Sequence, residues 1–324
     1  MGKKEDLLSL FENNKGCYLS GEDIAEKLSV SRTAVWKIVN SLRKGGYKID
    51  AVQNKGYCLS AETDILSPQG VCKYLEPICS DLKIEVLQIA ESTNTLMRES
   101  AANGAAEGRV IIANSQTGGR GRRGHTFYSP DNTGVYMSIL LKPLYYSAKD
   151  AVKITTMAAV AVCEAIESVS GKSAQIKWVN DIFVNGKKVC GILTEASFGL
   201  EDGFLDYAIL GIGINAFTPK GGFPPEIQNI AGSVFENAQS DGKNRLAAEV
   251  LNKFMAYYKT SQKENYVKNY KSRSLLIGKS VNVISPHGTK TAQAIDIDNE
   301  CRLIVEYPDG KTEALSSGDV SVKL

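Results

Sequence analysis

The spacing of hydrophobic residues in the first 60 positions predicts three short helices followed by two strands. Residues 3–12 place apolar side chains on one helical face, and a second helix is expected to begin after Ser20. Ser31 can cap a third helix, whose inward stripe would comprise Val35, Ile38, Val39 and Leu42. Residues 47–52 and 57–60 have strand patterns on either side of a glycine-containing turn. Together these elements predict a winged helix-turn-helix.

Polar and basic side chains remain on the outward face of the third predicted helix. They are Arg32, Thr33, Trp36, Lys37 and Asn40. Their guanidinium, ammonium, hydroxyl and amide groups suit contacts to phosphates and base edges, which predicts that this face binds DNA. Two alternatives stay open, because a winged helix can be a structural or protein-binding module and Trp36 can pack against the next domain.

Strand-like and helix-like segments alternate from residue 83 to about residue 215, and a further helix pattern follows. Strands are expected at 83–90, 109–113, 135–141, 175–178, 181–184, 188–195 and 204–214. Helices are expected from a Ser92 cap to about Asn103, from Lys149 to Val169 and from Leu246 to Tyr258. Asn185-Gly186 is a hairpin turn signal. The pattern indicates an α+β domain with a largely antiparallel or mixed sheet.

The last 50 residues predict a separate all-β unit. Short strand patterns occupy 279–284, 289–297, 302–307 and 320–323. A polar stretch ahead of Pro68 marks the other boundary. We therefore expect a multidomain α+β chain with domains at 1–64, 65–273 and 274–324.

The distribution of charge supports a nucleic-acid partner, although the total does not. The 324 residues carry 38 lysines and arginines against 36 aspartates and glutamates, a formal charge of +2, which taken alone argues against nucleic acid. Residues 32–60, however, hold six basic side chains and one acidic side chain, a net charge of +5. This excess lies on the predicted winged helix and favours DNA binding.

Other features of the composition exclude several classes of protein. The seven cysteines are scattered without a CxxC pair, and the two histidines are too few for a His-rich metal site or an obvious catalytic triad. No run approaches 18 consecutive apolar residues, and the first residues lack a signal-peptide pattern. We therefore expect a cytoplasmic protein with no membrane partner.

Residues 118–124 combine four glycines with three arginines. Glycine lets backbone N–H groups approach an anion, and arginine supplies forked, permanently charged donors, so this loop favours a phosphate or carboxylate ligand. Its spacing fits neither a P-loop nor a dinucleotide fingerprint. An RGG-like RNA-binding or disordered segment is the alternative.

Two further segments are candidates for chemistry. Lys177, at the end of a strand, can hold a negative charge in a partly dry site, or it can be an ordinary edge-strand lysine. Asp181, nearby in the sequence, can serve structure or Mg²⁺. Residues 91–94 lie at a strand-to-helix junction, where polar groups either cap the helix or fix a neutral polar ligand.

Five motifs, taken in order, resemble the biotin protein ligase family. They are ESTN (91–94), SQTGGRGRRG (115–124), KWVND (177–181), CGILTE (190–195) and GIGIN (211–215). With the winged helix in front, the chain looks like the bifunctional type, a biotin ligase that is also the biotin operon repressor. The resemblance implies a class II synthetase-like ligase domain with a mixed sheet and a small C-terminal SH3-like β-barrel. Val179 stands where this family usually has proline.

The resemblance also implies a reaction and its partners. The carboxylate of biotin attacks the α-phosphate of ATP, with Mg²⁺ present, and forms biotinyl-5′-AMP and pyrophosphate. A lysine of a biotin carboxyl carrier protein then takes the biotin and releases AMP. Biotinyl-5′-AMP would also act as corepressor, promoting a homodimer that binds operator DNA at genes of biotin biosynthesis and transport.

The residues that match the family motifs acquire expected roles. The implied biotin-binding residues are Ser92, Thr93, Asn94, Gln116, Arg120, Gly121, Arg122, Lys177, Gly211 and Gly213. The implied nucleotide-binding residues are Arg120, Arg122, Lys188 and Asn215, and Lys177 and Arg122 are the expected catalytic residues. Two other functions remain as alternatives: a ligase for a related acid such as lipoate, and a ligand-sensing transcription factor without transferase activity.

Overall fold

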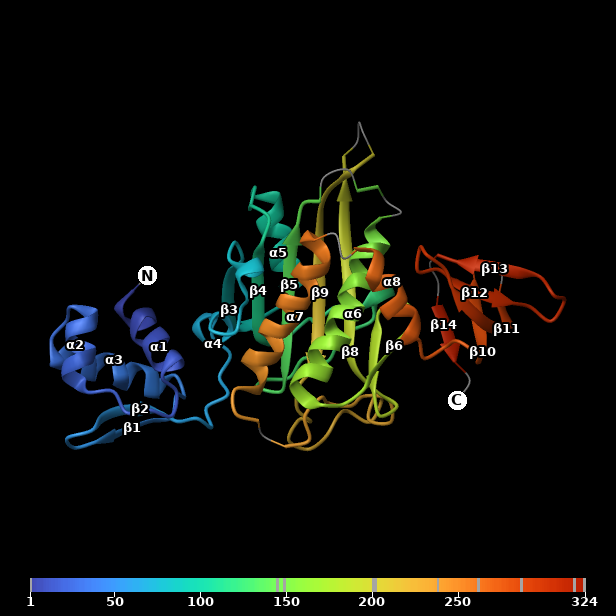
Figure 1. Ribbon diagram of the computed structural model, residues 1–324. Helices are drawn as coiled ribbons and strands as arrows, with labels where there is room; N and C mark the ends of the chain where they lie inside the picture. The colour runs from blue at the N-terminus through green and yellow to red at the C-terminus, as the bar shows by residue number, and fades with distance from the viewer. Residues whose placement is uncertain are drawn as a thin grey trace.

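Three units lie side by side in the computed structural model, a small helical unit, a large central sheet with helices, and a small β unit (Figure 1). The structure describes residues 2–143, 146–147, 150–199, 203–237, 239–260, 263–285, 288–316 and 319–322. The two chain ends lie in the two outer units, on opposite sides of the central one (Figure 1). No helix in these ranges is long and apolar enough to cross a membrane.

The N-terminal unit is the predicted winged helix-turn-helix. Its elements are α1 (Lys3–Asn13), α2 (Gly21–Leu28), α3 (Arg32–Lys44), β1 (Ile49–Val52) and β2 (Gly56–Leu59). The two predicted caps are confirmed, since Ser20 Oγ accepts from the backbone N–H of Glu22 and Ser31 Oγ accepts from that of Ala34. The inward stripe of α3 packs against α1 and α2 as expected, although Ile38 is only partly buried.

The central unit contains a seven-stranded mixed sheet within the described residues, which confirms the predicted fold class. The order is β3-β4-β5-β9-β8-β7-β6, with β3 parallel to β4 and all other neighbours antiparallel. The strands are β3 (Lys83–Ala90), β4 (Arg109–Gln116), β5 (Gly134–Leu141), β6 (Ala174–Lys177), β7 (Asp181–Val184), β8 (Lys187–Phe198) and β9 (Leu205–Asn215). Asn185 and Gly186 join β7 to β8 with φ angles of 50° and 72°, as the hairpin turn requires.

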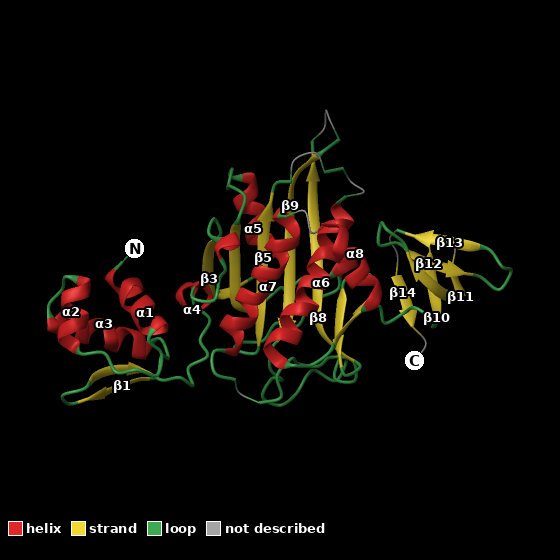
Figure 2. Cartoon of the chain, viewed as in Figure 1, coloured by secondary structure: helices red, strands yellow, loops and turns green. Residues whose placement is uncertain are grey.

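Helices cover the two faces of this sheet unequally (Figure 2). Among the described helices, α5 (Thr93–Ala102) is the one that packs on one face, where Met97 clusters with Ile111, Leu140 and Ile209 of the strands. α6 (Ala151–Ser170), α7 (Gly242–Lys259) and α8 (Lys263–Ser272) cover the other face and enclose the main hydrophobic core. α6 is the predicted long helix; Lys149, its expected first residue, lies outside the described residues.

The C-terminal unit is the predicted all-β unit, with five antiparallel strands among the residues described. They are β10 (Ser280–Ser285), β11 (Gly288–Ile297), β12 (Leu303–Glu306), β13 (Thr312–Leu315) and β14 (Asp319–Val322), in the order β13-β12-β11-β10-β14. The unit contacts the central one through Trp178, whose indole N–H donates to the carbonyl of Cys301 at 2.9 Å.

The hydrophobic pattern missed several elements. α4 (Pro68–Cys72) and η1 (Pro77–Cys79) are single turns, too short to show a helical period. β13 buries only Leu315, so no alternation is visible. α8 is rich in lysine and asparagine, and its burial depends on two aromatic side chains, Tyr266 and Tyr270.

Four charged residues join the winged helix to the central unit, and we call them the interdomain ion cluster. Glu12 and Lys15 come from the N-terminal unit, whereas Lys73 and Asp241 belong to the central one. Lys15 Nζ lies 2.9 Å from Asp241, Lys73 Nζ lies 2.7 Å from Glu12, and Lys73 also pairs with Asp241. The four side chains are 1–10% exposed. Removing one partner would leave charges buried without compensation.

Asp241 is the centre of this cluster. Tyr74 and Asn244 each donate a hydrogen bond to its carboxylate at 2.8 Å, in addition to the two lysines. Burial raises the pKa of Asp241, but the hydrogen bonds from Lys73 and Lys15 outweigh burial and leave the pKa below its ordinary value. The carboxylate therefore remains ionised across the neutral range.

Asp241→Asn should destabilise the protein by about 3 kcal/mol at pH 7, measured by urea unfolding, because the two lysines lose a buried counter-charge. Asn tolerates the left-handed backbone of this position, where φ is 59°, so the change adds no backbone strain; it removes the charge and turns an N–H₂ group toward one of the donors. A folded-state pKa below the unfolded value of about 3.9 means that the stabilisation is full above pH 4 and is lost as the pH falls further.

The difference between wild type and Asp241→Asn should therefore shrink below about pH 4. Asp309→Asn is the matched control, because Asp309 pairs with Lys311 at 3.4 Å on the exposed surface. It should change stability by less than about 0.5 kcal/mol. Equal unfolding midpoints for Asp241→Asn and wild type at pH 7 would show that the cluster contributes nothing.

Candidate functional site

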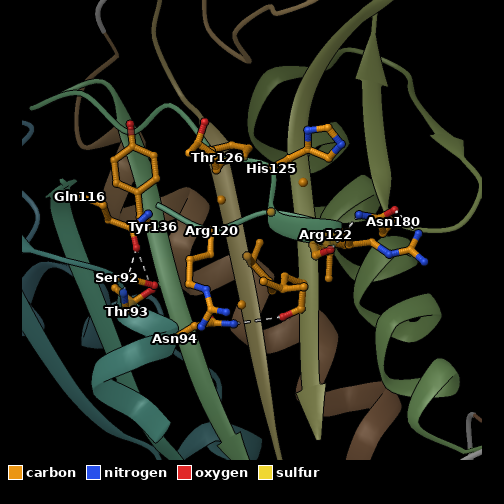
Figure 3. Close-up of a pocket in the computed structure, with 18 of the residues that line it drawn as sticks. Ser92, Thr93, Asn94, Gln116, Arg120, Arg122, His125, Thr126, Tyr136 and Asn180 are labelled. Atoms are coloured by element: carbon orange, nitrogen blue, oxygen red, sulfur yellow. Dashed lines mark hydrogen bonds between the residues drawn. The ribbon is translucent and has the colours of Figure 1, made fainter. Parts of the chain in front are cut away.

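A cavity of about 200 Å³ opens on the α5 face of the sheet, beside the start of α5 (Figure 3). The strand residues under it are small and lie opposite one another in the register: Ser138 of β5 pairs with Gly211 of β9, and Gly213 of β9 pairs with Gly191 of β8. Because these positions lack large side chains, space remains between the sheet and the loop that follows β4.

Neutral polar groups from the start of α5 and the end of β4 line one end of the cavity. Ser92 caps α5, and the backbone N–H of Thr93 donates to Gln116 Oε1 at 2.9 Å. The buried hydroxyl of Ser138 lies 2.8 Å from Thr93 Oγ1 and donates to Asn94 Oδ1 at 2.6 Å. This end therefore offers hydroxyl and amide groups without a net charge.

Residues 118–127, the arginine loop, fold into a small hairpin over the cavity. The backbone N–H of Gly121 donates to the carbonyl of His125 at 2.7 Å, and that of Phe127 donates to the carbonyl of Gly119 at 2.9 Å. A Cβ at Gly119 would lie 2.3 Å from the carbonyl oxygen of Phe127, so only glycine fits there. The loop is ordered by its own backbone, which argues against a disordered RGG-like segment.

Glu195 of β8 accepts hydrogen bonds from two side chains beside the cavity and forms an ion pair with a third. Asn94 Nδ2 donates to its carboxylate at 2.8 Å and Arg98 Nη2 donates at 2.7 Å. Arg120 Nη1 of the arginine loop lies 3.3 Å from the same carboxylate. One acidic side chain thus touches both α5 and the loop.

The other end of the cavity is basic. Arg122 Nη1 donates to Asn180 Oδ1 at 3.2 Å, and the amide of Asn180 in turn donates to the carbonyl of Ile192. Lys188 pairs with Asp181 at 2.7 Å. The two cations are held in defined positions, as electrostatic stabilisation of an anion requires.

A second cavity of about 110 Å³ adjoins this basic end. Lys188 lines both cavities, and Asn215 lines the second one. The remaining walls are mainly apolar: Phe127, Tyr128, Phe223, Ile227, Ile230 and Ala231. A ligand with a flat apolar group and a negative charge would place the charge at Lys188.

No described cluster of three or more His, Cys, Asp or Glu side chains could hold a metal ion. Burial raises the pKa of the Cys190 thiol well above its ordinary value and raises the pKa of Tyr136 to about 12. Both groups are neutral at pH 7, so neither is an activated nucleophile.

The structure brings most of the predicted ligand-binding residues together. Those that line the first cavity are Ser92, Thr93, Asn94, Gln116, Arg120, Gly121, Arg122, Lys188, Gly211 and Gly213. Lys177 is not among the lining residues; it is partly buried at the end of β6, opposite Asp181 of β7. Asn215 lies at the second cavity.

Sequence reasoning missed several lining residues and one neighbour. His125, Thr126, Phe127 and Tyr136 line the cavity, and Glu195 binds its polar end. The glycine at 213 is the one sequence feature that relates to Phe127, because a Cβ at Gly213 would lie 2.7 Å from the Phe127 ring. This packing of the ring against Gly213 becomes visible only when β9 and the arginine loop are placed together.

The expected DNA-binding residues lie on the outer surface of α3. Arg32, Thr33, Trp36 and Lys37 are exposed, and the Trp36 ring, 54% exposed, is not part of the hydrophobic core of the central unit in the described residues. Asn40 is partly buried, and its side-chain oxygen accepts from Arg43 at 3.4 Å.

Three family models match the chain. They are the biotin/lipoate A/B protein ligase family at residues 86–215, an HTH domain at 3–58 and the biotin protein ligase C-terminal domain at 276–323. The bifunctional ligase/repressor BirA of Bacillus spizizenii is 33% identical, with 98% of each chain covered. The Escherichia coli protein of the same name is 25% identical over 98% of this chain and 96% of its own length.

Solved structures support the same fold. The biotin protein ligase from Aquifex aeolicus, in complex with biotin and ATP, superposes with a TM-score of 0.63 at 24% identity, covering 74% of this chain and 98% of its own. The matched share is smaller here than for the full-length bifunctional relatives.

Gly213→Ala should destabilise the protein by about 1–3 kcal/mol in urea unfolding, because the new Cβ forces the Phe127 ring to move. Gly21→Ala is the control, since its Cβ would meet Tyr57 at an ordinary 3.5 Å. Equal stability of Gly213→Ala and wild type would mean that the ring is free to move and does not wall the cavity.

Proposed function

The chain belongs to the family of bifunctional biotin protein ligases and repressors, and from this premise we propose how its residues perform both tasks. It is an ATP-dependent biotin–protein ligase with a DNA-binding repressor domain. The observation that carries the assignment of the site is the polarity of the cavity, with neutral hydroxyl and amide groups at one end and Arg122 with Lys188 at the other.

This polarity suits biotinyl-5′-AMP. The ureido ring of biotin is neutral and polar, and we propose that Ser92, Thr93 and Gln116 bind it at the polar end. The aliphatic chain would lie against the apolar walls. The carboxylate and the α-phosphate would lie near Arg122 and Lys188, with the adenosine toward Asn215 in the second cavity. Biotin's own carboxylate is the nucleophile, so the neutral Cys190 and Tyr136 are no obstacle to the reaction.

Charge stabilisation is then the main task of the protein in the first step. Arg122 and Lys177 would stabilise the negative charge that develops as the carboxylate attacks the α-phosphate. Mg²⁺ belongs to this proposal as the partner of the ATP phosphates. The arginine loop would exclude water and protect the mixed anhydride until a lysine of a biotin carboxyl carrier protein takes the biotin.

A related acid such as lipoate fits the polar end less well. The dithiolane ring of lipoate has no amide, so it would form no hydrogen bonds with the hydroxyl and amide groups of Thr93 and Gln116 and would gain nothing from this end of the cavity. ATP–pyrophosphate exchange measured separately with biotin and with lipoate distinguishes the two acids. Exchange driven by lipoate alone would overturn the assignment.

For the repressor task, we propose that α3 enters the major groove of operator DNA. The exposed positions of Arg32, Thr33, Trp36 and Lys37 and the local charge of +5 support this role. Biotinyl-5′-AMP would promote a homodimer that presents two winged helices to a two-fold operator. We place the protein in the cytoplasm, where its carrier protein and DNA are both available, and divide it at 1–64, 65–273 and 274–324.

Lys177→Ala should lower the rate of biotin transfer by a factor on the order of 10²–10³, because a positive charge near the reacting carboxylate is lost. Transfer of labelled biotin to a carrier domain measures the overall rate, and ATP–pyrophosphate exchange isolates the first step. Lys83→Ala, an exposed lysine on the outer strand β3, serves as control. A near-normal exchange rate in Lys177→Ala would remove Lys177 from the reaction.

Lys37→Gln should weaken operator binding and reduce the slope of log affinity against log salt by about 1, because one phosphate contact is lost. Fluorescence anisotropy with promoter DNA at several salt concentrations, with and without biotin plus ATP, provides both values. Lys4→Gln on α1 is the control. An unchanged slope would exclude Lys37 as a phosphate ligand, and affinity that ignores biotin and ATP would exclude the corepressor mechanism.

A further inference from the structure

We propose that Glu195 is a positioning residue that ties the arginine loop to the polar end of the biotin site, with Arg120 as the tether. Of Arg120 and Arg122, only Arg122 then faces the nucleotide. The proposal rests on the assignment of the cavity to biotin and ATP. It adds a division of labour within the arginine loop and assigns a role to an acidic residue outside the cavity lining.

The geometry of Glu195 is that of a shared acceptor. Its Oε1 lies 2.7 Å from Arg98 Nη2 and 3.3 Å from Arg120 Nη1, while its Oε2 accepts from Asn94 Nδ2 at 2.8 Å. The carboxylate is 24% exposed, so bulk water screens it only in part. Asn94 and Arg98 belong to α5 and Arg120 belongs to the arginine loop, so one carboxylate links these two segments, beside the backbone hydrogen bond that Gly118 donates to the carbonyl of Glu91 at 2.8 Å.

Asn94 shows what this carboxylate does to the polar end. Its Nδ2 donates to Glu195 and, at 3.4 Å, to the carbonyl of Leu193, whereas its Oδ1 accepts from Ser138. A Cβ at Gly211 would lie 2.2 Å from the same Oδ1, so the amide is packed against bare backbone. Glu195 therefore fixes which way the Asn94 amide faces and keeps the surrounding floor in one arrangement.

The two arginines of the loop point in different directions. In Figure 3, Arg120 extends toward Asn94, whereas Arg122 extends toward Asn180. The guanidinium of Arg120 forms an ion pair with Glu195, and that of Arg122 donates to Asn180 next to the basic end. Glu195 thus affects both the binding of biotin and the position of the loop, while the binding of ATP depends on Arg122.

Glu195→Gln is the direct test, because glutamine keeps the shape but turns an N–H₂ group toward one of the donors and removes the charge. The Michaelis constant for biotin should rise about tenfold, as expected when charge-assisted hydrogen bonds are lost. The Michaelis constant for ATP should stay within about twofold and kcat should change less than the constant for biotin. A general loss of folding would instead lower the apparent kcat and leave both Michaelis constants near their wild-type values.

Trypsin cleavage reports on the tether independently of turnover. In Glu195→Gln without added ligand, trypsin should cut the loop after its arginines several times faster than in wild type. Biotin plus ATP should slow this cleavage. Glu85→Gln is the matched control, because Glu85 pairs with Arg109 at 2.8 Å on the exposed outer strands of the same sheet. It should change neither the Michaelis constants nor the rate of cleavage.

Arg120→Gln completes a double-mutant cycle. If Glu195 acts through Arg120, the double variant should raise the Michaelis constant for biotin by less than the product of the two single effects. Multiplicative effects, or an unchanged biotin constant in Glu195→Gln, would overturn the proposal, as would an Arg120→Gln variant that raises the ATP constant as much as the biotin constant. Wild-type protein that fails to turn over biotin would instead refute the assignment of the cavity.

Discussion

The structure depends on a packing constraint in the central sheet. Both faces of a sheet need cover, and here one face is closed along its length by α6, α7 and α8, whereas α5 covers only part of the other. Beyond the start of α5, small residues at Ser138, Gly211 and Gly213 replace the large apolar side chains that such a face normally carries. The space that results is sealed by a loop, and the site lies inside it.

Charge is distributed around that space so that three cations that line it each have a partner. Arg120 pairs with Glu195, Lys188 pairs with Asp181, and Arg122 donates to Asn180. Three arginines in adjacent positions repel one another, and a hairpin that holds them close needs this compensation. The structure thus directs donors for an anionic ligand toward the cavity.

Local features of the sequence were sufficient to predict most helices and strands, but not the side-chain contacts between them. Ser20, Ser31 and the Asn185-Gly186 turn act within a few residues, so a short pattern predicts their effects. Most residues of the family motifs line one cavity in the structure, although Lys177 does not. Glu195 and the interdomain ion cluster could not be predicted, because Asn94 meets Glu195 across 101 positions and Lys15 meets Asp241 across 226. Such pairs follow from topology, which periodicity does not encode.

The interdomain ion cluster also limits how freely the parts of this protein can be exchanged. Lys73 and Asp241 lie on the central unit, buried, with their counter-charges on α1 and the turn after it. A DNA-binding domain taken from another protein would have to supply a carboxylate and an ammonium at the positions of Glu12 and Lys15. Otherwise Lys73 and Asp241 would be buried at the interface with fewer counter-charges. The winged helix is therefore matched to the central unit, and substitution of Glu12 or Lys15 is constrained by that unit as well as by DNA binding.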